Sequence, residues 1–284
     1  MRVTEKARLL EAGLGNRYTV LASTDSTMRE MDALIAKGCP DGSIVLALEQ
    51  TKGRGSGDRE WKSGAGNVLF SRSIAVLQSE YGQEMEIIAA GAVMEIVRDL
   101  LPDRDVTLKY PNDVLVDGDK ICGCLVPPSW DANPGYARIV NLGVGVNLKT
   151  APELADGNRA TSLAKLGVAL DIDDFMLKFE SAFADILSYY RQHSDFNAVL
   201  GRLGFLDSDG MMTLRPNGSG DAVRGAYGGF HIDDDDGKKA IFLVLRVQAA
   251  QMEFDVHSVT MSGSLRRNFA QTTQQGKIDH AKCG

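Results

Sequence analysis

The sequence predicts a mixed α+β fold, in which a largely antiparallel sheet with flanking helices is followed by a small all-β domain. A run that is apolar on nearly every side, from Gln83 to Leu101, indicates a helix packed deep against a sheet. Asp117-Gly118 lies between two strand-like runs and is a strong hairpin signal. After Gly204 the pattern changes to short strand candidates separated by turn residues, which is typical of a small β-barrel.

These patterns also suggest the domain boundaries. A chain of 284 residues is long enough for one large and one small domain. We expect the large domain over residues 1–204, the small β-barrel over residues 205–262 and a polar, poorly ordered tail over residues 263–284.

The elements of the large domain can be assigned in order. Thr27 followed by Glu30 fits a capping box, and Gly38 should end the helix that Thr27 begins. Strands are then expected at residues 43–48, 67–77, 106–110, 114–116, 120–126 and 138–147, and further helices at 173–191 and 196–203.

The small domain has four strand candidates, at residues 211–215, 222–227, 241–247 and 252–256. The run of four acids from Asp233 to Asp236 is most simply a solvated loop between two of them.

Composition and charge exclude some classes of function. The chain is 44% hydrophobic and 24% charged, as in ordinary globular proteins, and its formal net charge is -7. That balance argues against non-specific nucleic-acid binding, which needs a basic surface. Local basic loops can still bind a phosphate.

The cysteines and the N-terminus bear on the compartment. Four cysteines in 284 residues do not form a disulfide framework, and Cys122 and Cys124 should be buried free thiols on one side of a strand. No apolar run reaches membrane-spanning length, and no signal peptide is recognisable. A reducing, cytoplasmic location is therefore expected, although the mixed Arg, Lys and Glu content of residues 1–15 leaves a mitochondrial transit peptide open.

A glycine-rich basic loop follows the strand at 43–48. Gly53, Gly55 and Gly57 give the backbone unusual freedom, and Arg54 and Arg59 bring guanidinium groups into the same segment. Such a loop can wrap an anion with main-chain N–H groups and arginine side chains. By itself it could equally be a flexible surface loop.

A second polar cluster, Lys109-Tyr-Pro-Asn-Asp113, is followed by Lys120 and Gly123 on the returning strand. A carboxylate and an ammonium group can thereby lie beside one pocket, where the lysine could offset charge that develops on a phosphate. Pro-Asn-Asp in isolation would be interpreted as a plain turn.

Taken together, the motifs resemble the biotin protein ligase family, within the biotin/lipoate ligase superfamily. The resemblance covers roughly residues 17–190. It rests on Asp-Ser-Thr at 25–27, Gln50, Gly-Arg-Gly at 53–55, Trp61, the motif at 109–113, Lys120, Gly123 and Gly-Val-Gly-Val-Asn at 143–147. It implies a class II synthetase-like catalytic domain and an SH3-like C-terminal barrel.

The resemblance also implies a two-step reaction. A biotin carboxylate attacks the α-phosphate of ATP, and a lysine of a biotin carboxyl carrier domain then attacks the biotinyl-5′-AMP. Mg²⁺ would accompany ATP, because the departing pyrophosphate needs charge neutralisation. No resident metal site is expected. The glycine-rich loop would close over the adenylate and keep it from water.

Residue roles follow from the same resemblance. Three residues are expected to be catalytic: Arg54, Asp113 and Lys120. Biotin would be bound by Ser26, Thr27, Gln50, Gly53, Arg54, Lys120 and Gly123. ATP and the adenylate would be bound by Arg54, Gly55, Ser56, Trp61, Asn112, Lys120, Gly145 and Asn147.

The chain departs from the family pattern at a few positions. Ser56 stands where many members have a second arginine, which removes a guanidinium group from the loop, and Arg59 could compensate. Met28 replaces a frequent Asn, and Pro127-Pro128 stands where a Glu is frequent. No winged-helix segment is recognisable before residue 17, so specific DNA binding is not expected.

Two alternatives remain open. The first is lipoate or octanoate transfer on the same fold, against which the motif at 109–113 and Gln50 favour biotin. The second is a non-catalytic adenylate- or carrier-binding homologue, which Ser56 and Met28 would fit. Nucleotide hydrolases are excluded, because the chain has no Gly-x-x-x-x-Gly-Lys-Ser/Thr motif.

Overall fold

The computed structural model describes residues 17–57, 59–77, 80–127, 138–153, 159–206, 210–216, 223–235, 238–247, 250–255 and 259–261. The expected tail from Gly263, the N-terminal residues 1–15, Pro128 and Cys283 lie outside these ranges.

The large domain is built on a seven-stranded sheet. Its strand order is β1 (Tyr18–Leu21), β2 (Ile44–Ala47), β5 (Val68–Val76), β9 (Arg138–Val146), β8 (Asp119–Leu125), β7 (Asp113–Val116) and β6 (Val106–Lys109). Only the β1–β2 pair of this sheet is parallel. The predicted fold class is therefore confirmed, although β1 was not anticipated.

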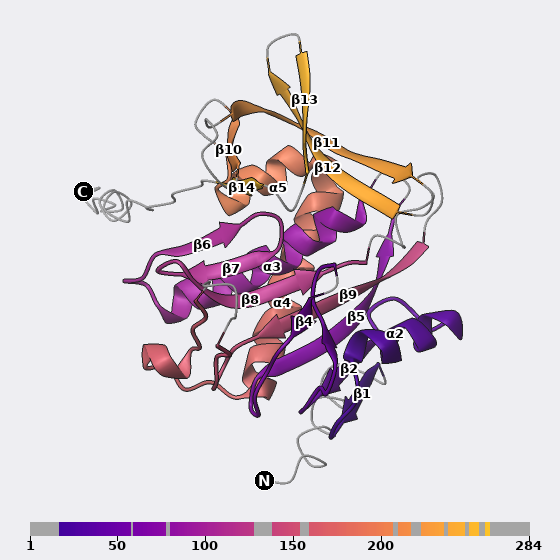
Figure 1. Ribbon diagram of the computed structural model, residues 1–284, viewed down its shortest axis with the longest axis vertical. Coiled ribbons are helices and arrows are strands. Elements are labelled where there is room, and N and C mark those ends of the chain that lie inside the picture. Colours follow the sequence, from indigo (N-terminus) through magenta and orange to yellow (C-terminus); the bar gives the residue numbers. More distant parts are fainter. Residues whose placement is uncertain are drawn as a thin grey trace, which may run out of the picture.

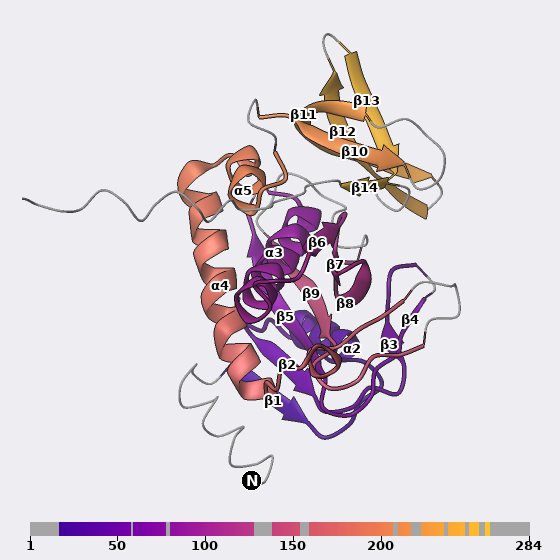
Figure 2. The ribbon, with the colours of Figure 1, turned by 90° about the vertical axis from the view of Figure 1, so that its left-hand side faces the viewer.

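Helices cover both faces of the sheet (Figure 2). On one face lie α3 (Gly82–Leu100) and α4 (Ile172–His193), with α5 (Phe196–Leu203) packed on α4. The other face carries α2 (Thr27–Ala36) and a short hairpin formed by β3 (Gly53–Arg54) and β4 (Glu60–Trp61). The glycine-rich loop thus contains a two-stranded hairpin. A 3-10 turn, η2 (Ala164–Leu166), precedes α4.

Burial explains the composition of α3 and α4. Nearly all side chains of α3 are buried, because it lies between the sheet and α4, as its all-round apolar sequence predicts. In α4 the apolar stripe includes Phe175, Phe179 and Phe183, and the Phe179 ring meets Phe70 of β5 edge-on at a centroid distance of 5.0 Å. Among the described residues, no helix is both long and apolar enough to cross a membrane.

The β7–β8 hairpin forms where Asp117-Gly118 predicts it. Both turn residues have positive φ, 50° at Asp117 and 84° at Gly118, as a two-residue hairpin turn of the I′ type requires. On β8, the thiols of Cys122 and Cys124 are buried and free, as expected, with their sulfur atoms 3.9 Å apart.

The C-terminal part is a five-stranded antiparallel sheet with the order β13-β12-β11-β10-β14 (Figure 1). The strands are β10 (Met212–Pro216), β11 (Val223–Asp235), β12 (Lys238–Val247), β13 (Ala250–Asp255) and β14 (Val259–Met261). The sheet agrees with the expected all-β domain, while its closure into a barrel and the exact domain boundaries stay predictions.

The expected acidic loop is wrong for three of its four residues. Asp233 to Asp235 continue β11, and Asp236 lies outside the described residues. The register places Asp234 opposite Lys239 and Asp235 opposite Lys238. The acids were assigned by their own polarity alone, which does not show the strand with which they pair.

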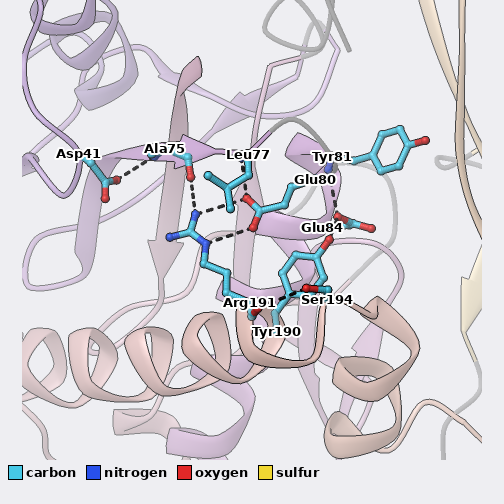
Figure 3. Close-up of polar contacts among 9 residues, drawn as sticks. All are labelled: Asp41, Ala75, Leu77, Glu80, Tyr81, Glu84, Tyr190, Arg191 and Ser194. Carbon is cyan, nitrogen blue, oxygen red and sulfur yellow. Dashed lines mark hydrogen bonds and ion pairs between the residues drawn. The ribbon is translucent and has the colours of Figure 1, made fainter. Parts of the chain in front are cut away.

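A buried polar cluster lies at the start of α3 (Figure 3). Glu84 accepts hydrogen bonds from the Tyr81 N–H at 3.0 Å, the Tyr190 hydroxyl at 2.7 Å and the Tyr227 hydroxyl at 2.8 Å. The neighbouring Glu80 pairs with Arg191 at 3.1 Å. Burial raises the pKa of Glu84 from its ordinary value of 4.5 to about 7, although the three donors act in the opposite direction.

This raised pKa predicts a pH-dependent contribution to stability. Between pH 4.5 and about 7 the folded protein binds more protons at Glu84 than the unfolded chain does, so the free energy of unfolding falls as pH rises through that window. Relative to Glu84→Gln, the unaltered protein should lose roughly 3 kcal/mol across it. Urea denaturation at a series of pH values measures this, with Glu153→Gln at an exposed carboxylate as control. The same difference in the control would contradict the assignment to Glu84.

Candidate active site

A cavity of about 340 Å³ lies between the sheet and the β3–β4 hairpin. Most of the residues selected from the sequence line it, although they come from separate segments of the chain. They are Thr27, Gln50, Arg54, Gly55, Ser56, Trp61, Asn112, Asp113, Lys120, Gly123, Gly145 and Asn147.

Two predicted ligand-binding residues are not among those lining the cavity. Ser26 is the N-cap residue of α2 and is fully buried, and its hydroxyl has no partner within the described part of the chain. Gly53 lies in the hairpin opposite Trp61, and an added Cβ would come within 2.5 Å of the Trp61 carbonyl oxygen. Gly53 therefore allows the two strands of the hairpin to approach each other.

Lys120 and Asp113 form an ion pair on the cavity wall, with Nζ 2.6 Å from Oδ1. A β-bulge makes this possible. Asp113 pairs with Gly123 in the β7–β8 ladder, but the register then shifts by one residue, so that Leu115 pairs with Lys120. Because side chains alternate across a strand, the shift places the lysine on the same face as Asp113. A regular register would have turned it away from the cavity.

The segment before Asp113 is fixed against β8 by two hydrogen bonds. The Asn112 side-chain amide donates to the Cys124 carbonyl at 2.6 Å, and the Cys124 N–H donates to the Asn112 carbonyl at 2.9 Å. Asn112 therefore has a clear structural role in the wall. Its predicted contact with a nucleotide stays a prediction.

Polar side chains gather at one end of the cavity. The Gln50 side-chain oxygen accepts from the Thr27 N–H at 2.7 Å and from the Thr27 hydroxyl at 3.1 Å. The buried Ser71 hydroxyl donates to Thr27 Oγ1 at 3.0 Å. These contacts hold Thr27 and Gln50 together in position for a polar ligand. Ser71 was not predicted, because its position in β5 gives no signal of its own.

Arg54 is oriented by residues that the sequence analysis missed. Its guanidinium group lies 3.3 Å from Asp32 of α2. The other Asp32 oxygen accepts from the fully buried Asn141 at 2.7 Å, and Asn141 also donates to the Met28 carbonyl at 2.8 Å. An asparagine inside the apolar run of residues 138–147 was the signal available in the sequence. Arg54 remains half-exposed at the cavity.

The indole of Trp61 lies directly on two glycines of the sheet. An added Cβ would come within 2.4 Å of the ring at Gly145 and 2.9 Å at Gly123, and these glycines are register partners in β8 and β9. Lys120 Nζ lies 5.2 Å from the ring centroid, close enough for a cation–π contact. The indole N–H is buried and has no partner among the described atoms. The two glycines are therefore needed to seat the indole, because a side chain at either position would meet the ring.

Two residues that were expected to bind the nucleotide, Asn147 and Ser56, make further contacts. Asn147 donates to the Thr161 carbonyl at 3.1 Å and is held by Asn67 at 3.5 Å, and Asn67 is a contact the sequence analysis missed. Arg59 lines the cavity and donates to both the backbone carbonyl and the hydroxyl of Ser56. Arg59 is thus held beside the position where the second loop arginine is missing.

The fold and the cavity together define an α+β small-molecule-binding domain with a lysine–carboxylate pair and an arginine at one site. Sequence comparison extends this. The profile of the Biotin/lipoate A/B protein ligase family matches residues 20–144. A biotin–[acetyl-CoA-carboxylase] ligase of Paracoccus denitrificans is 34% identical over 175 residues, which cover 58% of this chain and 70% of the relative. The chain belongs to this ligase family.

Two other relatives are matched over less of their length. A biotin–[acetyl-CoA-carboxylase] ligase of Mycobacterium tuberculosis is 38% identical over 57% of this chain and 60% of its own length. The bifunctional ligase/repressor BirA of Bacillus subtilis is 30% identical over 61% of this chain and 54% of its own. The chain therefore spans somewhat more than half of each.

Solved structures confirm the fold. The biotin protein ligase of Aquifex aeolicus, solved with biotin and ATP, superposes with a TM-score of 0.60 at 21% identity, over 88% of this chain and 100% of that one. The ligase of Leishmania major, solved with biotinyl-5-AMP, gives a TM-score of 0.56 at 20% identity, over 84% and 99%. The predicted family and fold class are both confirmed.

The seat of Trp61 generates a prediction. Gly145→Ala places a methyl group within 2.4 Å of the indole, which must leave the sheet and become more exposed. Iodide quenching of tryptophan fluorescence, in a Trp130→Phe background, should increase about twofold or more, as for a buried ring that reaches solvent. Gly201→Ala is the matched control, because its added Cβ would have a nearest neighbour at 3.8 Å. Unchanged quenching in Gly145→Ala would mean that the indole does not occupy this seat in solution.

Proposed function

We propose that this protein is a biotin protein ligase, which uses ATP to attach biotin to a lysine of a biotin carboxyl carrier domain through biotinyl-5′-AMP. The observation that carries the proposal is the Lys120–Asp113 ion pair on the wall of a cavity that Arg54 also lines. The names of the similar proteins support the choice of biotin and ATP.

In the first step, a biotin carboxylate oxygen attacks the α-phosphorus of ATP, a new O–P bond forms and pyrophosphate leaves. Lys120 offsets negative charge shared by the carboxylate and the α-phosphate, and Arg54 adds a second cation. Thr27 and Gln50, fixed by their mutual hydrogen bonds, lie where they can bind the polar ring of biotin. Ser26 and Gly53, which do not line the cavity, would support Thr27 and Gln50 rather than contact biotin.

In the second step, the amine of an acceptor lysine attacks the acyl carbon, and AMP leaves with the C–O bond electrons. Asp113 lies at the mouth of the cavity with 20% of its side chain exposed, so it can orient the incoming amine and accept its proton.

Mg²⁺ enters this proposal with the nucleotide. Among the described residues, no group of three His, Cys, Asp or Glu side chains could hold a metal ion by itself. In the proposal Mg²⁺ is carried by the ATP phosphates, whose charge it neutralises.

The glycine-rich hairpin would act as the lid over the adenylate. Gly55, Ser56 and Arg59 line the cavity from this hairpin, and Trp61 lies at its far end. Gly145 and Asn147, which line the cavity, would contact the adenylate. The proposal includes no repressor activity, and the net charge of -7 supports this.

The direct test combines the purified protein with ATP, Mg²⁺, biotin and a biotin carboxyl carrier domain. Biotin-dependent pyrophosphate release and biotin transfer are both expected, with little activity on lipoate or octanoate. Lys120→Ala should lower the rate of adenylate formation by about 100-fold or more, because a charge-stabilising cation is lost. Lys178→Ala, on the exposed face of α4, should not. Preference for lipoate would favour the sister activity, and no turnover with any acid would favour a non-catalytic homologue.

Ser56 generates a second prediction. The adenylate should escape from this protein faster than from a Ser56→Arg variant, because the serine leaves Arg59 as the guanidinium group held at this point of the loop. A difference of about tenfold corresponds to one charge-assisted contact. Dissociation of preformed biotinyl-5′-AMP can be followed in a trapping assay. Equal release rates would show that Arg59 already compensates fully.

A further inference from the structure

The proposed chemistry does not use the buried carboxylate of Glu84. Its side chain lies in the first turn of α3, and the residue is only 3% exposed. One oxygen accepts from the Tyr81 N–H and the Tyr190 hydroxyl, as Figure 3 shows, and the other accepts from the Tyr227 hydroxyl. A buried carboxylate is tolerated only where hydrogen bonds replace water, so all three donors contribute to keeping it there.

The three donors come from different parts of the fold. Tyr81 precedes α3, Tyr190 belongs to α4, and Tyr227 belongs to β11 of the C-terminal sheet. Phe196 of α5 joins the two tyrosines, with ring centroids 5.3 Å from Tyr190 and 5.4 Å from Tyr227. Glu84 is therefore a point where the C-terminal sheet is bonded to the large domain.

The same corner borders the wall of the cavity. Tyr110, which directly precedes Pro111, Asn112 and Asp113, is buried, and its hydroxyl has no partner in the described structure. Burial, with the carboxylates of Glu86 and Glu84, raises the pKa of Tyr110. The C-terminal sheet also touches the strand that leads into Tyr110, because β14 contacts β6.

The other charged groups of this corner have their own partners. Arg191 binds Glu80 and donates to the Ala75 carbonyl at 2.5 Å (Figure 3). Glu86 accepts from the Val126 N–H at 2.5 Å and thereby holds the end of β8, the strand that carries Lys120. Glu84 thus faces neutral phenols and a backbone N–H, and the Tyr227 bond is its link to the C-terminal sheet.

We propose that Glu84 is a positioning residue which, through its hydrogen bond with Tyr227, lets the C-terminal sheet hold the wall segment 110–113 in the geometry needed for transfer at Asp113 and Lys120. Glu84 touches neither the cavity nor the reacting atoms. It acts through α3, which contacts β6 and β7 on either side of the wall segment, and through the β14–β6 contact. The kinetic part of this inference rests on the proposed ligase function.

Two variants separate this role from simple stabilisation. Tyr227→Phe and Tyr190→Phe each remove one hydroxyl donor from the same carboxylate, but only Tyr227 comes from the C-terminal sheet. Tyr227→Phe should lower kcat for biotin transfer by about tenfold, since small displacements of reacting groups are costly, and should leave KM for biotin within about twofold. Tyr190→Phe should lower Tm to a similar extent while leaving kcat and KM within about twofold.

Hydrogen exchange supplies a readout that does not need activity. Amide exchange over residues 106–116 should be faster in Tyr227→Phe than in the unaltered protein, and unchanged in Tyr190→Phe. The inference is overturned if both variants change kcat and exchange equally, if Tyr227→Phe changes neither, or if it raises KM for biotin as much as it lowers kcat. If the unaltered protein shows no biotin-dependent turnover, the ligase proposal fails, while the exchange comparison still decides whether Tyr227 holds the wall.

Discussion

The shifted register of the β7–β8 hairpin is the constraint on which the site depends. The turn at Asp117-Gly118 fixes where the chain reverses, and the bulge after Val114 fixes which face Lys120 occupies. Both are local features of a short segment, and together they place Lys120 on the same face as Asp113. Other segments of the chain supply the second wall of the cavity, its polar end and its cover from solvent.

That second wall is made by contacts between distant segments. Gly123 and Gly145 are paired strand residues without side chains, and the space they leave is filled by the indole of Trp61, from a hairpin much earlier in the chain. In a packed sheet, a missing side chain has to be replaced by something, and here the replacement belongs to the same loop that carries Arg54. The contact of the Trp61 indole with Gly123 and Gly145 therefore also fixes the position of the loop.

The difference between local features and contacts between distant segments explains how much of the structure could be predicted from the sequence. The apolar run of α3, the turn at Asp117-Gly118 and the stripe of phenylalanines in α4 follow from local periodicity, and the structure has them within one or two residues. Motif order was enough to select a set of residues most of which line the cavity. Asp32, Asn141 and Ser71 were missed because their roles depend on partners that are remote in sequence, and no spacing rule joins Asp32 to Arg54. The acidic run at 233–235 was misassigned for the same reason, since its strand partners lie beyond the turn.

The attachment of the C-terminal sheet at Glu84 affects how this protein can be divided. A fragment that ended at Gly204 would keep Tyr81 and Tyr190 but would lose the phenol that satisfies the remaining carboxylate oxygen, and the ring of Phe196 would lose its cover on one side. Water would then enter the corner behind Tyr110, and the fragment would carry an acid with a different proton affinity from that of the whole chain. Gly204 is therefore a poor position for truncation, because residues on both sides of it donate hydrogen bonds to the same buried carboxylate.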